Sequence, residues 1–306
     1  MNTKSFLMLI RREAWEHRSL VWVPAITAAL IVLAALISTN ISGSIQINVD
    51  GQESFFFKAL AADVKTQANL LSIWTSAIGL PVIFITSIVL YFYLIDSLYA
   101  ERKDRSILFW KSMPVSDAAT VLSKAATALI AVPIWIWLMS VVMGLLTFAI
   151  VALKVSGTPL APLANFHVGA WFVTQLTLLQ NFFIAALWYS PLVGWLLLVS
   201  VWAKRAPFLW AISPGFIAIF EELFFDTEYV SRLISYRVTH YFEVTAVRVN
   251  IEDGAGVETI IDTIQNTYSR LSAAPLLGEL HLYTGVLAAA VLLLAAIRLR
   301  RWRDDT

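Results

Sequence analysis

Six long apolar runs constrain this chain more than any other feature. They fall at about 20–39, 73–95, 125–153, 171–202, 207–224 and 282–297 of the 306 residues. Roughly 20 apolar residues are enough to cross the hydrocarbon core of a bilayer. Only 14% of the residues are charged, which is too few to cover a water-facing surface of this size. The sequence therefore predicts an all-α polytopic membrane protein with six transmembrane helices.

Basic residues are distributed unevenly over the segments between these runs. Fifteen of the 22 Lys and Arg lie in the N-terminal segment, the second loop, the fourth loop and the C-terminal tail. The other seven are spread over the first, third and fifth loops, which together are far longer. Because Lys and Arg accumulate on the cytoplasmic side of a membrane, the sequence predicts that both termini are cytoplasmic.

The chain divides into four segments on this basis. Residues 1–19 precede the first span, 20–224 hold spans one to five, and 282–306 hold span six and a basic tail. The second loop, 96–124, is a charged island between two apolar runs. The polar segment 225–281 is predicted to be a small external module, with an extended stretch near 247–251 and a helical apolar stripe over 257–271.

The N-terminal segment is predicted to be an amphipathic helix over residues 3–18. Phe6, Leu7, Ile10 and Ala14 recur at helical spacing, and most of the charged residues lie elsewhere. Such a helix can lie in the membrane interface with its apolar face toward lipid. A solvated flank with the same periodicity is the alternative interpretation.

Several kinds of chemistry are absent from the sequence. The chain has no Cys, no GxxxxGK[ST] phosphate-binding motif and no HExxH motif. A net charge of +1 indicates no nucleic-acid partner. We therefore predict no catalytic, cofactor-binding or metal-binding residue in this chain. Ion-driven carriers usually place ionisable groups inside the membrane, and these spans carry charges only near their ends, which indicates an energy source on another polypeptide.

Polar residues in the fourth span and two acidic residues near the end of the fifth are candidates for a substrate pathway. They are Gln175, Gln180, Asn181, Trp188, Tyr189, Glu221 and Glu222. Gln180 and Asn181 fit interhelical hydrogen bonding equally well.

The pair Glu221-Glu222 has three interpretations. It marks the external end of a short helix, lines an exit mouth, or serves an intramembrane metalloprotease together with His167, His240 and His281. Membrane proteases of the prenyl-protein class carry EExxxR, and this chain has Asp226 in place of the Arg.

Three stretches of the charged island resemble the transmembrane subunit of type-2 ABC transporters. They are Leu98-Tyr99-Ala100-Glu101-Arg102-Lys103-Asp104, Met113-Pro114-Val115-Ser116 and Val121-Leu122-Ser123-Lys124. In that family a similar run links spans two and three and forms a coupling helix. The amphipathic N-terminal helix, the six spans and the basic tail extend the resemblance. Arg105-Ser106 departs from it, since family members commonly have Gly-Thr there.

The resemblance implies a permease subunit of an ATP-driven exporter in the bacterial cytoplasmic membrane. Two such permeases, as a homodimer in the simplest case, would pair with two ATP-binding subunits that hold the ATP and Mg²⁺. The residues implied in coupling are Glu101, Arg102, Lys103, Pro114, Val115, Ser116, Asp117 and Lys124. Ser116 is a favourable N-cap for a short helix Asp117–Lys124. A non-transport accessory protein, a membrane enzyme and an ion-driven carrier are the alternatives.

Overall fold

A computed structural model describes residues 3–38, 69, 77–104, 115–156, 167–245 and 272–302. Every regular element in these ranges is helical. The predicted extended stretch near 247–251, the stripe over 257–271 and Pro114 lie outside them. The all-α prediction is therefore confirmed for the part of the chain that the structure describes.

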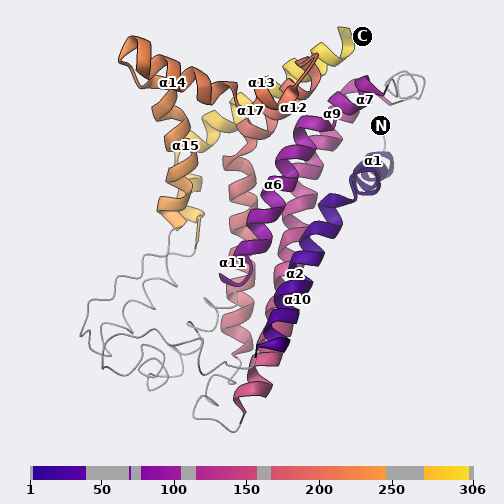
Figure 1. Cartoon of the computed structure of the whole chain (residues 1–306), viewed down its shortest axis with the longest axis vertical. Coiled ribbons are helices and arrows are strands. Elements are labelled where there is room, and N and C mark those ends of the chain that lie inside the picture. The colour runs from indigo at the N-terminus through magenta and orange to yellow at the C-terminus, as the bar shows by residue number, and fades with distance from the viewer. Residues whose placement is uncertain are drawn as a thin grey trace.

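Five helices in the described ranges are long and apolar enough to cross a membrane, which confirms the polytopic architecture. They are Ser19–Ile37, Leu80–Lys103, Asp117–Lys154, Val168–Trp188 and Leu280–Trp302. Figure 1 shows α2 (Ser19–Ile37), α6 (Leu80–Asp96) and α10 (Val132–Val155) as a bundle, with α11 (Val168–Trp188) behind it. Helix α17 (Leu280–Trp302) rises beside them toward the end where the C-terminus lies.

The predicted short coupling helix and the third span form one continuous helical rod. Helix α9 (Asp117–Ala126) passes through a π-helical turn, η1 (Thr127–Ala131), directly into α10. The backbone N–H of Ala119 donates to Ser116 Oγ at 3.2 Å, so Ser116 caps α9 as predicted. No loop separates the coupling helix from the span, because neither Gly nor Pro lies between Asp117 and Val132. Pro133 falls in the first turn of α10, just after the π-helical turn η1.

The fourth predicted span is broken into two helices. Helix α11 ends at Trp188, and α12 (Ser190–Trp202) begins with Pro191 in its first turn. A proline is tolerated there because the first helical N–H groups have no partner within the helix. The interruption of the fourth apolar run therefore falls at this proline.

The fifth predicted span, 207–224, is not a single helix. Helix α13 (Pro207–Ala211) is followed by Ile212, which separates it from α14 (Ser213–Phe225), a helix of 13 residues. At 1.5 Å per residue α14 is about 20 Å long, short of a hydrocarbon core of about 30 Å. Asp226, in the left-handed conformation with φ of 50°, follows it, and α15 (Tyr229–Thr245) then runs back toward the middle of the molecule (Figure 1).

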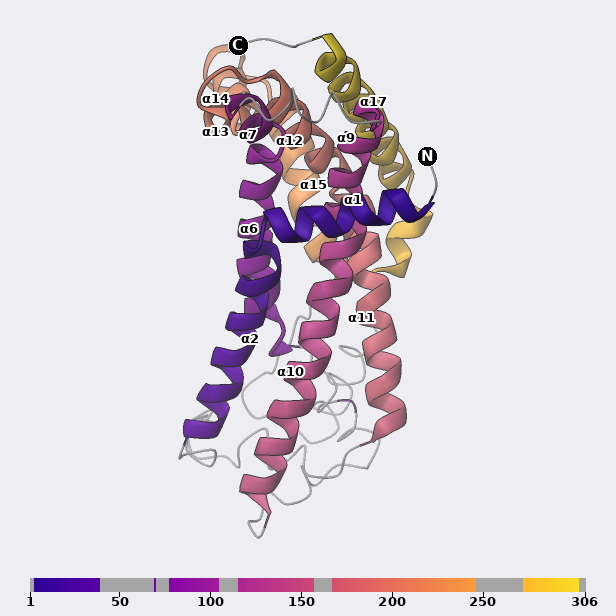
Figure 2. The ribbon, with the colours of Figure 1, turned by 90° about the vertical axis from the view of Figure 1, so that its right-hand side faces the viewer.

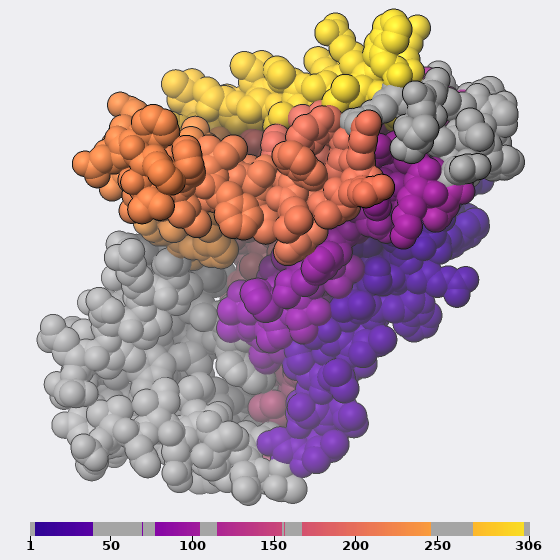
Figure 3. Space-filling model, turned by 45° about the horizontal axis from the view of Figure 1, so that its top comes forward, coloured from indigo at the N-terminus to yellow at the C-terminus, as the bar shows by residue number. Residues whose placement is uncertain are grey.

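Helix α1 (Thr3–Glu16) lies across the bundle (Figure 2). It packs on α9 and η1. On the far side of α9, α12 packs along α17, where Gly194 brings the two backbones together: a Cβ built there would lie 3.2 Å from the carbonyl oxygen of Ala289. With the top of the molecule tilted forward, the orange segment that includes α14 lies next to yellow α17 (Figure 3).

Candidate functional site

A cluster of buried charges and one tyrosine joins five helical elements, α1, α6, α7 (Tyr99–Lys103), α9 and α17, at the base of the charged island. We call it the charged cluster; its members are Arg12, Glu13, Tyr93, Glu101, Asp117, Lys124 and Arg300. Glu13 comes from α1, Glu101 from α7, Lys124 from α9 and Arg300 from α17. Glu13 and Lys124 have no exposed side-chain surface.

Lys124 lies at the centre of this cluster. Its Nζ donates to both carboxylate oxygens of Glu13, at 3.0 and 2.9 Å, and lies 3.1 Å from Glu101 Oε1. The hydroxyl of Tyr93 donates to Glu13 Oε2 at 2.9 Å. Each buried charge thus has an opposite charge and further hydrogen bonds, which is the condition under which buried ions are tolerated.

Arg300 extends the cluster to the last helix. Its Nη1 donates to Glu101 Oε2 at 2.7 Å, and its Nε donates to Asp117 Oδ1 at 3.1 Å. Glu101 precedes the segment 105–114 and Asp117 follows it. One guanidinium therefore binds the two parts of the charged island that flank 105–114.

Arg102 and Ser200 attach the island to a sixth element, α12. The guanidinium of Arg102 donates to the carbonyl oxygens of Ser200 and Ala203, at 2.7 and 2.8 Å, where α12 ends. The hydroxyl of Ser200 accepts from the backbone N–H groups of Leu98 and Tyr99, both at 3.0 Å. A cation at a helix C-terminus also interacts favourably with the helix dipole.

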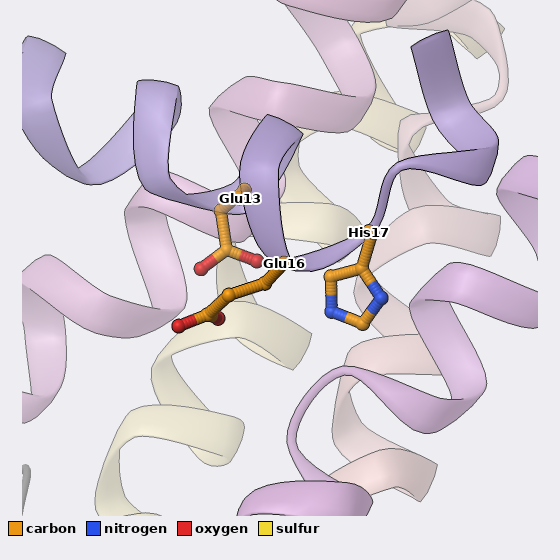
Figure 4. Close-up of side chains that lie close together, drawn as sticks. All are labelled: Glu13, Glu16 and His17. Carbon is orange, nitrogen blue, oxygen red and sulfur yellow. The ribbon is translucent and has the colours of Figure 1, made fainter. Parts of the chain in front are cut away.

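Glu13, Glu16 and His17 project from α1 and the turn after it in the same direction (Figure 4). Their ligand atoms lie within 4.8 Å of one another, a spacing compatible with a metal ion. However, Glu13 is paired with Lys124, and Glu16 Oε1 lies 3.1 Å from Arg12 Nε. Because these cations already compensate both carboxylates, the geometry assigns the group to ion pairing.

Burial shifts the pKa values of Glu16 and His17. Loss of water raises the pKa of the Glu16 carboxyl, against the influence of nearby Arg12. Loss of water also lowers the pKa of the His17 imidazole, and the charge of Lys124 lowers it further. His17 packs edge-on against the ring of Tyr93, with 4.7 Å between ring centroids.

The structure divides the predicted coupling residues into two groups. Glu101 and Lys124 are buried, Asp117 is paired with Arg300, and Arg102 binds the end of α12. In contrast, Lys103 and Ser116 are exposed, and Val115 is partly exposed. The buried residues have no surface for direct contact with a partner, whereas the exposed residues flank the segment 105–114.

Three of the predicted pathway residues come together, but they hold other parts of the chain. Trp188 is fully buried and its Nε1 donates to the Arg237 carbonyl oxygen at 2.7 Å. Asn181 Oδ1 accepts from the backbone N–H of Ala273 at 2.7 Å. The Tyr189 hydroxyl donates to the Val238 carbonyl oxygen. They anchor α15 and η3 (Ala274–Gly278) to the junction of α11 and α12.

The two glutamines behave differently from each other. Gln180 is exposed on α11. Gln175 is buried, its carbonyl oxygen accepts from Trp137 Nε1 at 2.9 Å, and its side-chain Oε1 has no hydrogen-bond partner in the described residues. The structure therefore does not bring Gln180 to the group formed by Asn181, Trp188 and Tyr189.

Glu221 and Glu222 have different environments although they are adjacent. The carboxylate of Glu221 accepts from the backbone N–H groups of Tyr229 and Val230, at 2.9 and 2.7 Å, and so caps the start of α15. Glu222 is exposed. Of the histidines considered with them, His240 lies 2.9 Å from Glu279 and His281 packs on Tyr236. These contacts give Glu221 a structural role.

Sequence reasoning missed Glu13, Ser200 and Arg300 as members of the site. Glu13 and Arg300 look like ordinary charges that flank a span, because the sequence does not show which side of a helix meets another helix. Lys124 and Glu13 are 111 positions apart. The sequence offers one signal that could have identified Glu13. Phe6, Ile10 and Glu13 recur at helical spacing, so a helix places Glu13 on the same side as these two apolar residues.

No family model, no curated protein and no solved structure matches this chain.

Proposed function

We propose that this chain is the permease subunit of an ATP-driven exporter of the type-2 ABC class. Two copies would form a pathway across the bacterial cytoplasmic membrane, with both termini in the cytoplasm. Two ATP-binding subunits would dock on the charged island and hold the ATP and Mg²⁺. This proposal combines the resemblance of the island with the way the island is attached to the helices.

The observation that carries the proposal is the charged cluster at the base of the island. A loop that transmits the movement of an ATPase must be rigidly connected to the transmembrane helices that move with it. Glu101 on one side of the island and Asp117 and Lys124 on the other are bound to α1 and α17, and Arg102 is bound to α12. We propose that the exposed side chains around 105–114 meet the ATPase and that the buried charges transmit its movement.

The orientation rests on charge and on the direction of the helices. Helix α7 and the turn between α12 and α13 lie near the same end of the molecule as the C-terminus (Figure 1). They carry the exposed basic residues Lys103, Lys204 and Arg205. Basic residues accumulate on the cytoplasmic side of membrane proteins. This end is therefore the one that we propose faces the cytoplasm and the ATPase.

The second permease copy is part of the same proposal. Helix α14 buries only Ala218, and its large apolar side chains, such as Phe216 and Leu223, are more than half exposed. A helix that is apolar nearly all round is buried in protein or lipid. A second copy would cover part of this surface.

The test is to express the chain with its genomic neighbours, solubilise it in detergent, and identify the proteins that copurify with it. We expect an ATPase with a Walker A motif and ATP hydrolysis in the purified complex. Lys103→Glu should weaken its binding, because Lys103 is exposed beside the island, whereas Lys204→Glu, on another exposed loop at the same end, should not. A chain that purifies without an ATPase, and with no effect of Lys103→Glu, would overturn the proposal.

A second pair of variants separates docking from transmission. Arg102→Met removes the contact with α12 and leaves the exposed side chains of the island in place. We expect the ATPase to remain bound while hydrolysis no longer depends on the permease. Loss of binding in Arg102→Met together with normal binding in Lys103→Glu would contradict this division of roles.

A further inference from the structure

The outward face of α1 carries large apolar and basic side chains in one stripe. Leu7, Met8 and Trp15 are 58%, 64% and 64% exposed. Lys4 and Arg11 are also exposed and recur at the same helical spacing, and Arg18, in the turn that follows the helix, is exposed as well. The members of this outward face are Lys4, Leu7, Met8, Arg11, Trp15 and Arg18.

Charge is segregated between the two sides of α1. Glu13 is fully buried in the charged cluster, and Leu9 is buried beside it. Arg12 turns inward, where it meets both Glu13 and Glu16. The outward face therefore has three cations, whereas both carboxylates of the helix are paired with cations of the protein.

The side chains on the outward face suit the boundary between lipid tails and head groups. The guanidinium of Arg11 lies 4.7 Å from the centre of the Trp15 ring. Trp is enriched at the depth of lipid head groups, and Arg and Lys extend from that depth toward phosphate. Helix α1 runs across the bundle (Figure 2), so all turns of this face can meet one membrane surface at a similar depth.

We propose that the outward face of α1 binds the head groups of anionic phospholipids. Three cations that form no ion pair with an acid of the described residues are complementary to an anionic surface. The apolar members of the face are what distinguishes a membrane from a soluble acidic partner, because a helix of this kind buries them at the acyl boundary. This binding is independent of any ATPase and goes beyond the proposed transport function.

The assignment also changes which face of α1 meets lipid. The sequence pattern predicts a lipid face of Phe6, Leu7, Ile10 and Ala14. In the structure Phe6, Ile10 and Ala14 are partly buried, and only Leu7 of the four is exposed. The predicted lipid face is therefore shared: Phe6, Ile10 and Ala14 turn toward the bundle and Leu7 turns outward. The ion pair between Glu13 and Lys124 fixes this rotation of α1.

The test uses the absence of Cys from the chain. Met8→Cys introduces a single thiol on the outward face, which is labelled with an environment-sensitive fluorophore. The full-length protein is placed in nanodiscs of phosphatidylcholine and phosphatidylglycerol at one fixed ratio, with a spin label on the head group of either lipid. Each cation near an anionic surface is worth about a fivefold change in affinity. We therefore expect spin-labelled phosphatidylglycerol to quench at least about twofold more strongly than spin-labelled phosphatidylcholine.

Two sets of variants complete the experiment. Replacing Lys4, Arg11 and Arg18 together by Gln should bring the quenching ratio of the two lipids to about one. Lys204→Gln with Arg205→Gln, which removes exposed cations elsewhere, should leave the ratio unchanged. All three cations of the outward face are exposed, so the elution profile of the variant should match the wild type. Equal quenching by both lipids in the wild type, weak quenching by both, or an unchanged ratio in the triple variant would overturn the proposal.

Discussion

Glu13 and Lys124 illustrate how a single residue pair determines where a helix docks. Both are fully buried, and each is the main partner of the other. Removing water from two charges costs several kcal/mol per ion, and the attraction between them offsets this only while both are present. The pair therefore specifies the position of α1 on α9 more strongly than apolar contacts alone.

Removing one member of the pair should destabilise the fold strongly. We expect Lys124→Met to lower the free energy of unfolding by about 3–5 kcal/mol, because it leaves Glu13 buried with less compensation. The double variant Glu13→Gln with Lys124→Met should recover much of this loss. Thermal unfolding in detergent measures both effects. The control is Lys103→Met, on the exposed side of the island, and an equal loss in this control would refute the prediction.

Protonation of His17 should make stability depend on pH. Burial lowers its pKa below the ordinary value of 6.5, so the folded state favours the neutral imidazole. The stability that neutral His17 contributes is fully present above pH of about 6.5, where the ring is neutral in both the folded and the unfolded state. This stability is lost as pH falls toward the lower pKa of the folded state.

The measurement is the unfolding temperature at pH of about 7.5 and about 5.5. We expect the wild type to lose more stability between these values than His17→Gln does. The raised pKa of Glu16 acts in the opposite direction, since deprotonation of Glu16 costs stability as pH rises. Glu16 is present in both proteins, so the comparison isolates His17. Identical pH profiles would show that His17 does not contribute.

At the scale of helices, hydropathy predicts the long elements well and their interruptions poorly. The predicted span 20–39 corresponds to α2, because an apolar run of that length has no other stable state in a membrane. The continuity of α9 with α10 is not visible in the sequence, since charged Lys124 resembles the edge of a span. Its burial depends on Glu13 and Glu101, which lie far away in the chain.

The hairpin of α14 and α15 depends on a contact that hydropathy does not register. Glu221 accepts from the first two backbone N–H groups of α15, and Asp226 supplies the left-handed turn between the helices. A pattern of apolar residues indicates that 207–224 avoids water, but it does not show whether the segment crosses the membrane or turns back. Glu221 joins the end of α14 to the start of α15, and α15 packs back against α14.

Glu221→Ala should loosen the start of α15, because Tyr229 and Val230 lose the acceptor for their N–H groups. We expect faster hydrogen exchange at these two amides and a lower unfolding temperature. Glu222→Ala is the matched control: Glu222 is adjacent and exposed, and its replacement should change neither quantity. If Glu222→Ala had the larger effect, the capping role of Glu221 would be wrong.

On the scale of the whole molecule, α7 and α9 of the charged island, the turn between α12 and α13 and the C-terminal end of α17 lie toward one end (Figure 1). Helices α2 and α10 end at the opposite end, where Lys154 Nζ donates to the carbonyl oxygens of Ala35 and Leu36 at 2.7 and 2.8 Å. A cation that binds the C-terminus of a neighbouring helix satisfies carbonyl groups that have no partner within that helix. Lys154 therefore lies at the predicted external end, where it stabilises the end of α2.

The location of α14 distinguishes the observed arrangement from a membrane crossing at 207–224. Single cysteines at Lys103, Lys204, Ser156 and Glu222 can be labelled with a membrane-impermeant maleimide in whole cells and in inverted vesicles. Lys103→Cys and Lys204→Cys should react from one side and Ser156→Cys, at the end of α10, from the other. Glu222→Cys should react with the first group, because α14 lies at the end that holds the island (Figure 1). Labelling of Glu222→Cys from the side of Ser156→Cys would instead mean that 207–224 crosses the membrane, as hydropathy alone predicts.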